Sequence, residues 1–138
     1  MSAERISNKV EGVAQPPPFI SPAIISNGFV FCSGQIGSTS DGQLVKGPIK
    51  NRVNQIMDNL DKVLKAHGSS LQDTVKFNLY ITSYDDFAEI NETYTKRIPS
   101  PAPTRTCIGV KSLPFGTDIE IECIGAIPSL TAKIKAKL

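Results

Sequence analysis

The 138-residue sequence contains no tryptophan, one histidine and three cysteines, and it has no long hydrophobic run. A transmembrane helix needs about 18 or more consecutive apolar residues, so we expect no membrane span and no membrane partner. The N-terminus also lacks the apolar stretch of a secretory signal. Glu4 and Glu11 argue against a mitochondrial presequence, which is poor in acidic residues. These absences predict an intracellular protein.

The scarcity of cysteine and histidine excludes several kinds of site. Cys32, Cys107 and Cys123 are an odd number at wide spacing, which fits neither a disulfide framework nor a CxxC metal or redox motif. His67 is the only histidine, so no His/Cys cluster is available for a metal ion. It falls in the segment KAHGSS, where Gly68 is typical of a helix C-terminus. We therefore expect no metal site and a structural role for His67.

Charge and composition say little about partners but suggest one ordinary globular domain. Fifteen basic residues against thirteen acidic ones leave a net charge of +2, and the basic residues are dispersed along the chain. An RNA-binding surface would need clustered basic residues and stacking aromatics, so we expect no nucleic-acid partner. With 40% hydrophobic residues, the chain is able to bury a core without disulfides or metals.

Hydrophobic periodicity predicts alternating strands and helices. The expected elements are a β-hairpin turning at Ser26-Asn27-Gly28, a helix from Ile49 to about His67, a strand over Thr74–Ile81, a helix beginning at Ser83, a strand beginning at Arg105, and a strand within residues 117–127. This order predicts an α+β fold in which both helices cover one face of a mixed sheet. The other face then needs a cover, and a second copy of the chain is the simplest one.

Two features suggest chemistry. Arg105 follows a proline-rich loop, and its guanidinium is suited either to a substrate carboxylate or to a structural ion pair with Glu120 or Glu122. Those two glutamates lie at i and i+2, on one face of a strand. Either both are solvated, or one points into a cleft where burial would raise its pKa and suit it to proton transfer.

The segments CSGQIG, TVKFNLYITSYDDFAEINETY, PTRTCIGVKSLP and DIEIECIGAI together resemble the RidA family, also called the YjgF or liver perchloric-acid-soluble protein family. The resemblance covers Ile6 to Ile127, which defines one domain over residues 1–128 and a tail over residues 129–138. It implies a chorismate-mutase-like fold and a homotrimer with clefts between subunits. It further implies a hydrolase of the 2-iminobutanoate/2-iminopropanoate deaminase type, which converts enamine and 2-imino acids to 2-oxo acids and ammonia without a cofactor.

The resemblance also assigns site residues. Arg105 would clamp the substrate carboxylate, with the Cys107 backbone beside it. Glu120 would position water or move a proton, and Ser33 and Asn91 match other positions in the cleft. Such a reaction needs an anchor, a water molecule and a proton relay, but no nucleophilic side chain.

One position departs from the family pattern. Members usually carry a tyrosine in the lead-in before the first hairpin, and its hydroxyl contributes to the substrate cleft. This chain has Phe19 followed by Ile20, and neither residue supplies a hydroxyl. The proton network is then either completed elsewhere or weaker.

Two other functions stay open for a member of this family. One is a ribonuclease that inhibits translation, although the dispersed basic residues do not favour it. The other is a non-catalytic trimer, chaperone-like or binding small carboxylates in the same clefts. A sensor of that kind would need Arg105 but not Glu120.

The C-terminal tail predicts a location. Ala136-Lys137-Leu138 resembles the Ser-Lys-Leu peroxisomal signal, and Lys133 and Lys135 flank it as in such signals. We therefore expect a peroxisomal protein, with the cytosol or the mitochondrion as alternatives. A frayed basic terminus is the competing interpretation.

Overall fold

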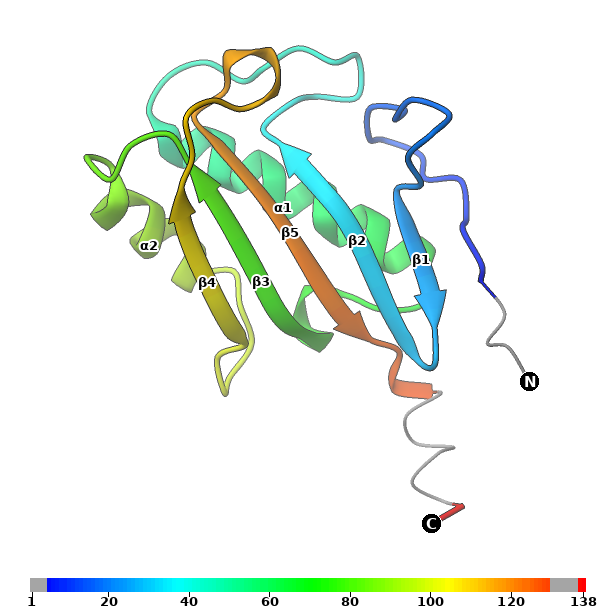
Figure 1. Cartoon of the computed structure of the whole chain (residues 1–138). Coiled ribbons are helices and arrows are strands. Elements are labelled where there is room, and N and C mark those ends of the chain that lie inside the picture. Colours follow the sequence, from blue (N-terminus) through cyan, green and yellow to red (C-terminus); the bar gives the residue numbers. More distant parts are fainter. Residues whose placement is uncertain (1–4, 130–136) are drawn as a thin grey trace.

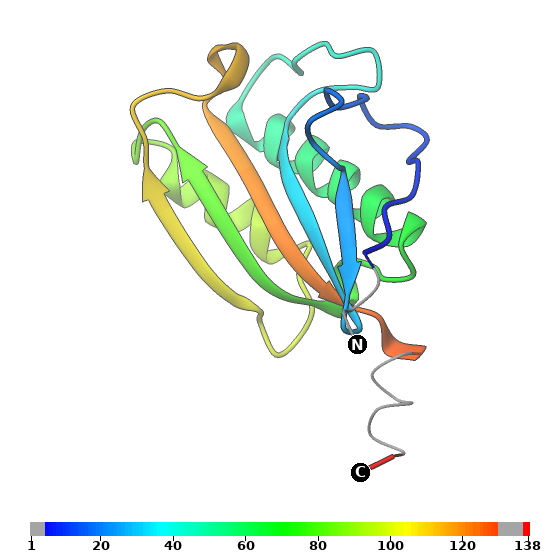
Figure 2. The same ribbon diagram turned by 45° about the vertical axis from the view of Figure 1, so that its right-hand side comes forward.

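The computed structural model describes residues 5–129 and 137–138. A five-stranded sheet carries both helices on the same face, as two views of the ribbon show (Figure 1, Figure 2). In chain order the elements are β1 Ala23–Ser26, β2 Phe29–Ile36, α1 Ile49–Ala66, β3 Thr74–Ile81, α2 Phe87–Thr95, β4 Thr104–Gly109 and β5 Ile119–Ala126, with short 3-10 turns at Leu71–Asp73 and Pro114–Gly116. The expected α+β fold is confirmed.

The sheet has the strand order β1-β2-β5-β3-β4. Only β3 and β4 run parallel, and α2 crosses between them, whereas the other neighbours are antiparallel. The hairpin between β1 and β2 forms at the expected turn, where Asn27 and Gly28 adopt φ angles of 52° and 82°. Asparagine and glycine tolerate this left-handed region better than other residues.

The core lies between the sheet and the apolar stripe of α1. Val53, Ile56 and Leu60 of the helix are fully buried against Phe77 of β3 and Ile121 of β5. Neither this helix nor any other in residues 5–129 and 137–138 is long and apolar enough to cross a membrane.

His67 ends α1 as expected, and Gly68 follows with a φ of 84°. The buried ring places Nδ1 2.7 Å from the Val63 carbonyl oxygen, and Nε2 accepts a 2.9 Å hydrogen bond from the backbone N–H of Asn8. Since both ring nitrogens are used inside the fold, this histidine has a structural role. It ties the N-terminal segment to the end of the helix.

Two local expectations are wrong. The second helix begins at Phe87 and not at Ser83, because the Ser83 hydroxyl accepts a hydrogen bond from the Asp85 N–H (3.1 Å) and thereby stabilises a turn. In the strand over Thr74–Ile81, the alternation of apolar residues predicts that Val75 shares the buried face of Phe77, but Val75 is 41% exposed and Thr74 is buried instead. The pairing register with β5 shifts between Thr74 and Lys76, which changes the face on which the strand's first side chains lie.

The sheet face opposite the helices has no cover among the described residues. Alternate residues of β5 divide between the two faces, with Ile119 and Ile121 in the core and Glu120 and Glu122 on the open face. Phe31 of β2 is also exposed there. We call this surface the open face.

Candidate active site

Arg105 lies on β4 opposite Phe77 of β3, so its side chain points to the helix side of the sheet. Its Nη1 donates a 2.7 Å hydrogen bond to Oδ1 of Asn91. The guanidinium carbon lies 5.0 Å from the ring centroid of Tyr94 and 5.7 Å from that of Phe87. Cation–π contacts at these distances hold the planar group in place. The side chain is therefore fixed at the edge of the sheet.

The spacing of three residues on α2 explains this cradle. Phe87, Asn91 and Tyr94 are separated by four and three positions, which places them on one face of a helix. Tyr94 is buried edge-to-face against Phe77, with ring centroids 5.3 Å apart. The core contact thus anchors α2, and α2 in turn positions the guanidinium of Arg105.

The alternative that Arg105 forms an ion pair with Glu120 or Glu122 is wrong for the single chain. Both glutamates lie on the open face, across the sheet from the guanidinium. Within residues 5–129 and 137–138, Arg105 has no carboxylate partner, and Asn91 takes only one of its five N–H donors. The remaining donors suit a planar carboxylate from outside the chain.

Cys107 lies two residues beyond Arg105, half-buried on the same side of β4. Burial raises the pKa of its thiol, so the reactive thiolate form is disfavoured. Its carbonyl oxygen accepts a 3.1 Å hydrogen bond from the Tyr84 hydroxyl. This environment fits a positioning role for the Cys107 backbone better than a nucleophilic role for its sulfur.

Glu120 and Glu122 differ in their surroundings. Glu122 accepts hydrogen bonds from the Tyr80 hydroxyl (2.6 Å) and from Nδ2 of Asn78 (3.0 Å), and the first bond raises the pKa of Tyr80 to about 12. The carboxyl group of Glu120 has no hydrogen-bond partner among the described residues, although its backbone pairs within the sheet. Burial, followed by the charge of Glu122, raises the pKa of Glu120. Of the two carboxyl groups, Glu120 is the one suited to exchanging protons with a ligand.

Gly34 is a functional position that the sequence analysis missed. A Cβ atom at this residue would overlap Oε1 of Glu120, so the carboxyl group lies directly over the glycine backbone. The pairing of β2 with β5 is interrupted between Cys32 and Gln35, which opens the strand at this point. A glycine inside a strand pattern often marks such a close approach, and that signal was available in the CSGQIG segment.

Ser33 belongs to the same interruption. Its N–H donates to the Pro22 carbonyl oxygen (3.0 Å), and its hydroxyl donates to the Ser21 carbonyl oxygen (2.6 Å). Both bonds join β2 to the segment before β1. Ser33 therefore holds the lead-in segment beside Glu120 rather than pairing with β5.

A cavity of about 550 Å³ opens above Glu120, and we call it the Glu120 cavity. Ser33 and Gly34 contribute to it from β2, Ile20 from the lead-in segment, and Phe115 from the turn before β5. Phe19 does not line it. The Phe19 side chain is 85% exposed and borders a separate depression on the surface with Phe31. Of Phe19 and Ile20, the one that lines the Glu120 cavity in the single chain is thus Ile20.

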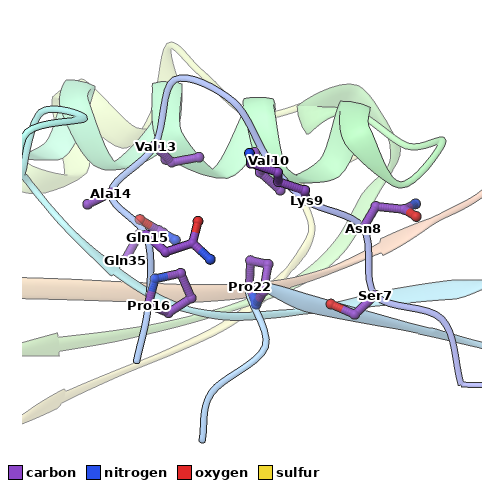
Figure 3. Close-up of a pocket in the computed structure, with 10 residues that line it drawn as sticks. All are labelled: Ser7, Asn8, Lys9, Val10, Val13, Ala14, Gln15, Pro16, Pro22 and Gln35. Carbon is purple, nitrogen blue, oxygen red and sulfur yellow. The ribbon is translucent and has the colours of Figure 1, made fainter. Parts of the chain in front are cut away.

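A smaller cavity of about 180 Å³ is lined mainly by the N-terminal segment, within residues 7–16 (Figure 3). Gln15 and Gln35 line it together with Pro16, and the same three residues also form part of the wall of the Glu120 cavity. Lys9 is the only charged residue at this smaller cavity. Its lining offers no carboxylate, and we assign it no chemistry.

The candidate residues thus form two groups. Arg105, Asn91 and Cys107 lie together on the helix side of the sheet, whereas Glu120 and Ser33 lie at the Glu120 cavity. One chain does not bring these groups together. The described residues contain no cluster of three or more His, Cys, Asp or Glu side chains that could hold a metal ion. The Arg105 group is therefore suited to binding an anion, and the Glu120 group is suited to exchanging protons.

Two relatives from Schizosaccharomyces pombe overturn the expected location. Protein mmf1, mitochondrial, is 43% identical over 105 residues, covering 74% of this chain and 64% of its own length, so the match spans less than two thirds of that relative. Protein mmf2, mitochondrial, is 43% identical over 107 residues, covering 75% of this chain and 84% of the relative. The expectation of a peroxisomal protein is wrong, because these names place the relatives in mitochondria. Of the tripeptide that suggested it, Ala136 lies outside the described residues, and Lys137 and Leu138 are exposed.

Further similarities cover most of the chain. The 2-iminobutanoate/2-iminopropanoate deaminase of Dermatophagoides farinae is 36% identical over 114 residues, covering 82% of this chain and 89% of the relative. The crystal structure of yeast Mmf1 superimposes with a TM-score of 0.86 at 33% identity, covering 89% of this chain and 98% of that one. Residues 14–127 match the family described as Endoribonuclease L-PSP. The chain therefore belongs to that family, the RidA or YjgF family that its motifs resemble.

Proposed function

We propose that this protein hydrolyses 2-imino acids and their enamine forms to 2-oxo acids and ammonia. The observation that carries the proposal is the cradle of Arg105, which fixes a guanidinium while leaving most of its donors free for a carboxylate. The name of the mite relative, a 2-iminobutanoate/2-iminopropanoate deaminase, supports the same reaction. The substrate is then a small 2-imino acid, and the reaction uses no cofactor.

The reaction requires little from the protein beyond positioning and proton transfer. The substrate carboxylate binds Arg105, which leaves the carbon of the C=N bond exposed to water. Water adds across the C=N bond, which places a hydroxyl on carbon and a hydrogen on nitrogen. A proton then moves from that hydroxyl to the nitrogen, the C–N bond breaks, and the products are ammonia and a 2-oxo acid. The carboxyl group of Glu120, whose pKa is raised by burial, is suited to accept and return that proton.

The division of the site between two faces of the sheet supports a two-subunit cleft. Arg105 and Glu120 extend from opposite faces of the sheet, so they meet only if a neighbouring chain contributes one of them. The open face, with its exposed Phe31, offers a surface on which a neighbour would pack. We propose a homotrimer with three such clefts, in agreement with the family resemblance.

The two alternative functions have less support from the geometry. The name of the matched family includes endoribonuclease activity, but Glu120 and Glu122 lie side by side on the open face and would repel phosphate groups. A non-catalytic carboxylate sensor would need the Arg105 cradle alone. The glycine that makes room for the Glu120 carboxyl group favours catalysis instead.

An imine assay tests the proposal directly. An amino-acid oxidase generates 2-imino acids in solution, and the rates of imine loss and of 2-oxo acid release are followed with and without the protein. We expect the protein to accelerate both rates, because it orients the imine and supplies a proton relay. Rates equal to the spontaneous ones would contradict the proposal. Cleavage of RNA by the same preparation would favour the ribonuclease alternative.

The missing hydroxyl at Phe19 leads to a second expectation. If its absence weakens the proton network, Phe19→Tyr should raise turnover several-fold, since a positioned general acid or base accelerates such reactions by more than that. The measurement is kcat for several imines. Because Ile20 lines the Glu120 cavity and Phe19 does not, Ile20→Tyr is the matched comparison. An unchanged or lower kcat for Phe19→Tyr would show that residue 19 does not supply this hydroxyl function.

A further inference from the structure

The Glu120 cavity is larger and more apolar than hydrolysis of a three-carbon imine requires. Its volume of about 550 Å³ falls in the range of roughly 300–1,000 Å³ typical of pockets for much larger ligands. Among the described residues that line it, Glu120 alone carries a charge. The apolar part of the wall includes Pro16, Pro17, Ile20, Ile36, Pro114 and Phe115.

Phe115 is the unusual member of this wall. Its backbone adopts φ 57° and ψ 21°, in the left-handed region that bulky residues rarely occupy. In the single chain this residue is 87% exposed, so packing in the chain's own core does not explain the choice of an aromatic residue here. An exposed aromatic ring on a strained turn beside a cavity is a feature found at ligand-binding sites.

Backbone hydrogen bonds stabilise the turn that places Phe115 beside the cavity. The N–H groups of Gly116 and Thr117 donate 3.2 Å hydrogen bonds to the carbonyl oxygens of Leu113 and Pro114 respectively. The strand that carries Glu120 begins directly after this turn. Ile20 reaches the same cavity from the lead-in segment, which Ser33 fastens to β2. Two apolar side chains from different segments therefore border the space above a single carboxyl group.

We propose that Phe115 and Ile20 form a subsite for the side chain of the imine, and that the protein prefers 2-imino acids with branched or aromatic side chains. This inference rests on the proposed imine hydrolysis. Contact with the Phe115 ring removes apolar substrate surface from water, and the gain grows with apolar area, so it is smaller for a substrate bearing only a methyl group. Discrimination by one or two methylene groups in an apolar pocket amounts to roughly ten-fold or more. Phe115 and Ile20 would thus determine which imine is preferred by contacting the substrate's side chain, without contacting its reacting atoms.

The test compares imines derived from alanine, leucine and phenylalanine, with wild-type protein, Phe115→Asn and Phe115→Leu. Asparagine tolerates the left-handed backbone, so Phe115→Asn removes the apolar ring without straining the turn. We expect kcat/KM of Phe115→Asn to fall about ten-fold for the leucine and phenylalanine imines and less than about two-fold for the alanine imine. Phe115→Leu keeps an apolar side chain and should retain most of the leucine-imine activity.

The outcomes separate this inference from the function on which it rests. A wild-type preference for the alanine imine, or an equal loss on all three imines in Phe115→Asn, would overturn the subsite while leaving imine hydrolysis intact. An unchanged ratio between large and small imines in Phe115→Asn would do the same. Failure of the wild-type protein to hydrolyse any of the three imines would overturn the proposed function, and the subsite with it.

Discussion

Arg105→Ala should abolish imine hydrolysis and leave the fold in place. The substitution removes a charge-assisted bidentate pair between enzyme and substrate, and losing one partner of such a pair at a desolvated site costs about 3–5 kcal/mol. This free energy corresponds to a fall in kcat/KM of roughly 150- to 5,000-fold, since each 1.36 kcal/mol is a factor of ten. The fold should survive, because with the described residues the Arg105 side chain makes one hydrogen bond, to Asn91, and no ion pair.

Arg105→Lys is the matched control for charge. Lysine keeps the positive charge but lacks the planar fork that binds a carboxylate through two donors, so it should restore only a small part of the activity. Thermal unfolding of all three proteins shows whether the fold is retained. Hydrolysis by Arg105→Ala at close to the wild-type rate would disprove the assignment of Arg105 as the carboxylate clamp.

Two inactive variants should restore activity when they assemble together. Arg105→Ala and Glu120→Gln each remove one half of every cleft, so each homotrimer should be inactive. In trimers co-expressed at equal amounts, a cleft is intact when the subunit giving Arg105 carries Glu120→Gln and its neighbour carries Arg105→Ala. Random assembly yields this arrangement in about one quarter of the clefts, and the recovered activity should approach that fraction.

Two controls make the mixing result decisive. Homotrimers of each variant, purified separately and mixed without subunit exchange, should stay inactive. Light scattering should give a mass near three times the 14.9 kDa of the chain. A mass equal to one chain, or no recovery in mixed trimers of verified composition, would show that Arg105 and Glu120 do not complete one site across a subunit boundary.

Local patterns in the sequence predicted most elements of the fold. The turn at Asn27-Gly28 and the helix from Ile49 depend on neighbouring residues, whose spacing alone identifies them. The second helix was placed four residues too early because a serine that is suited to capping a helix also stabilises a turn, and the Ser83 hydroxyl accepts a turn hydrogen bond from the Asp85 N–H. The start of a short helix therefore depends on whether such a serine caps the helix or stabilises a turn before it.

The division of the site between two faces was harder to predict. The face on which Arg105 lies is set by the pairing of β4 with β3, which aligns it with Phe77, nearly 30 positions earlier in the chain. The alternation of Glu120 with core residues is visible in the sequence, but the register between distant strands is not. Sequence reasoning therefore identified the candidate residues without showing that one chain separates them.

The close approach at Gly34 has a consequence for the inheritance of this activity. The glycine backbone is not in the left-handed region, so an alanine or serine codon arising there would still encode a chain that folds. The added carbon atom would nevertheless displace the Glu120 carboxyl group, because it would occupy the space of Oε1. Selection for the proposed imine hydrolysis would therefore keep glycine at position 34. In relatives that no longer need this reaction, a larger residue at this position would be tolerated and the fold would be kept.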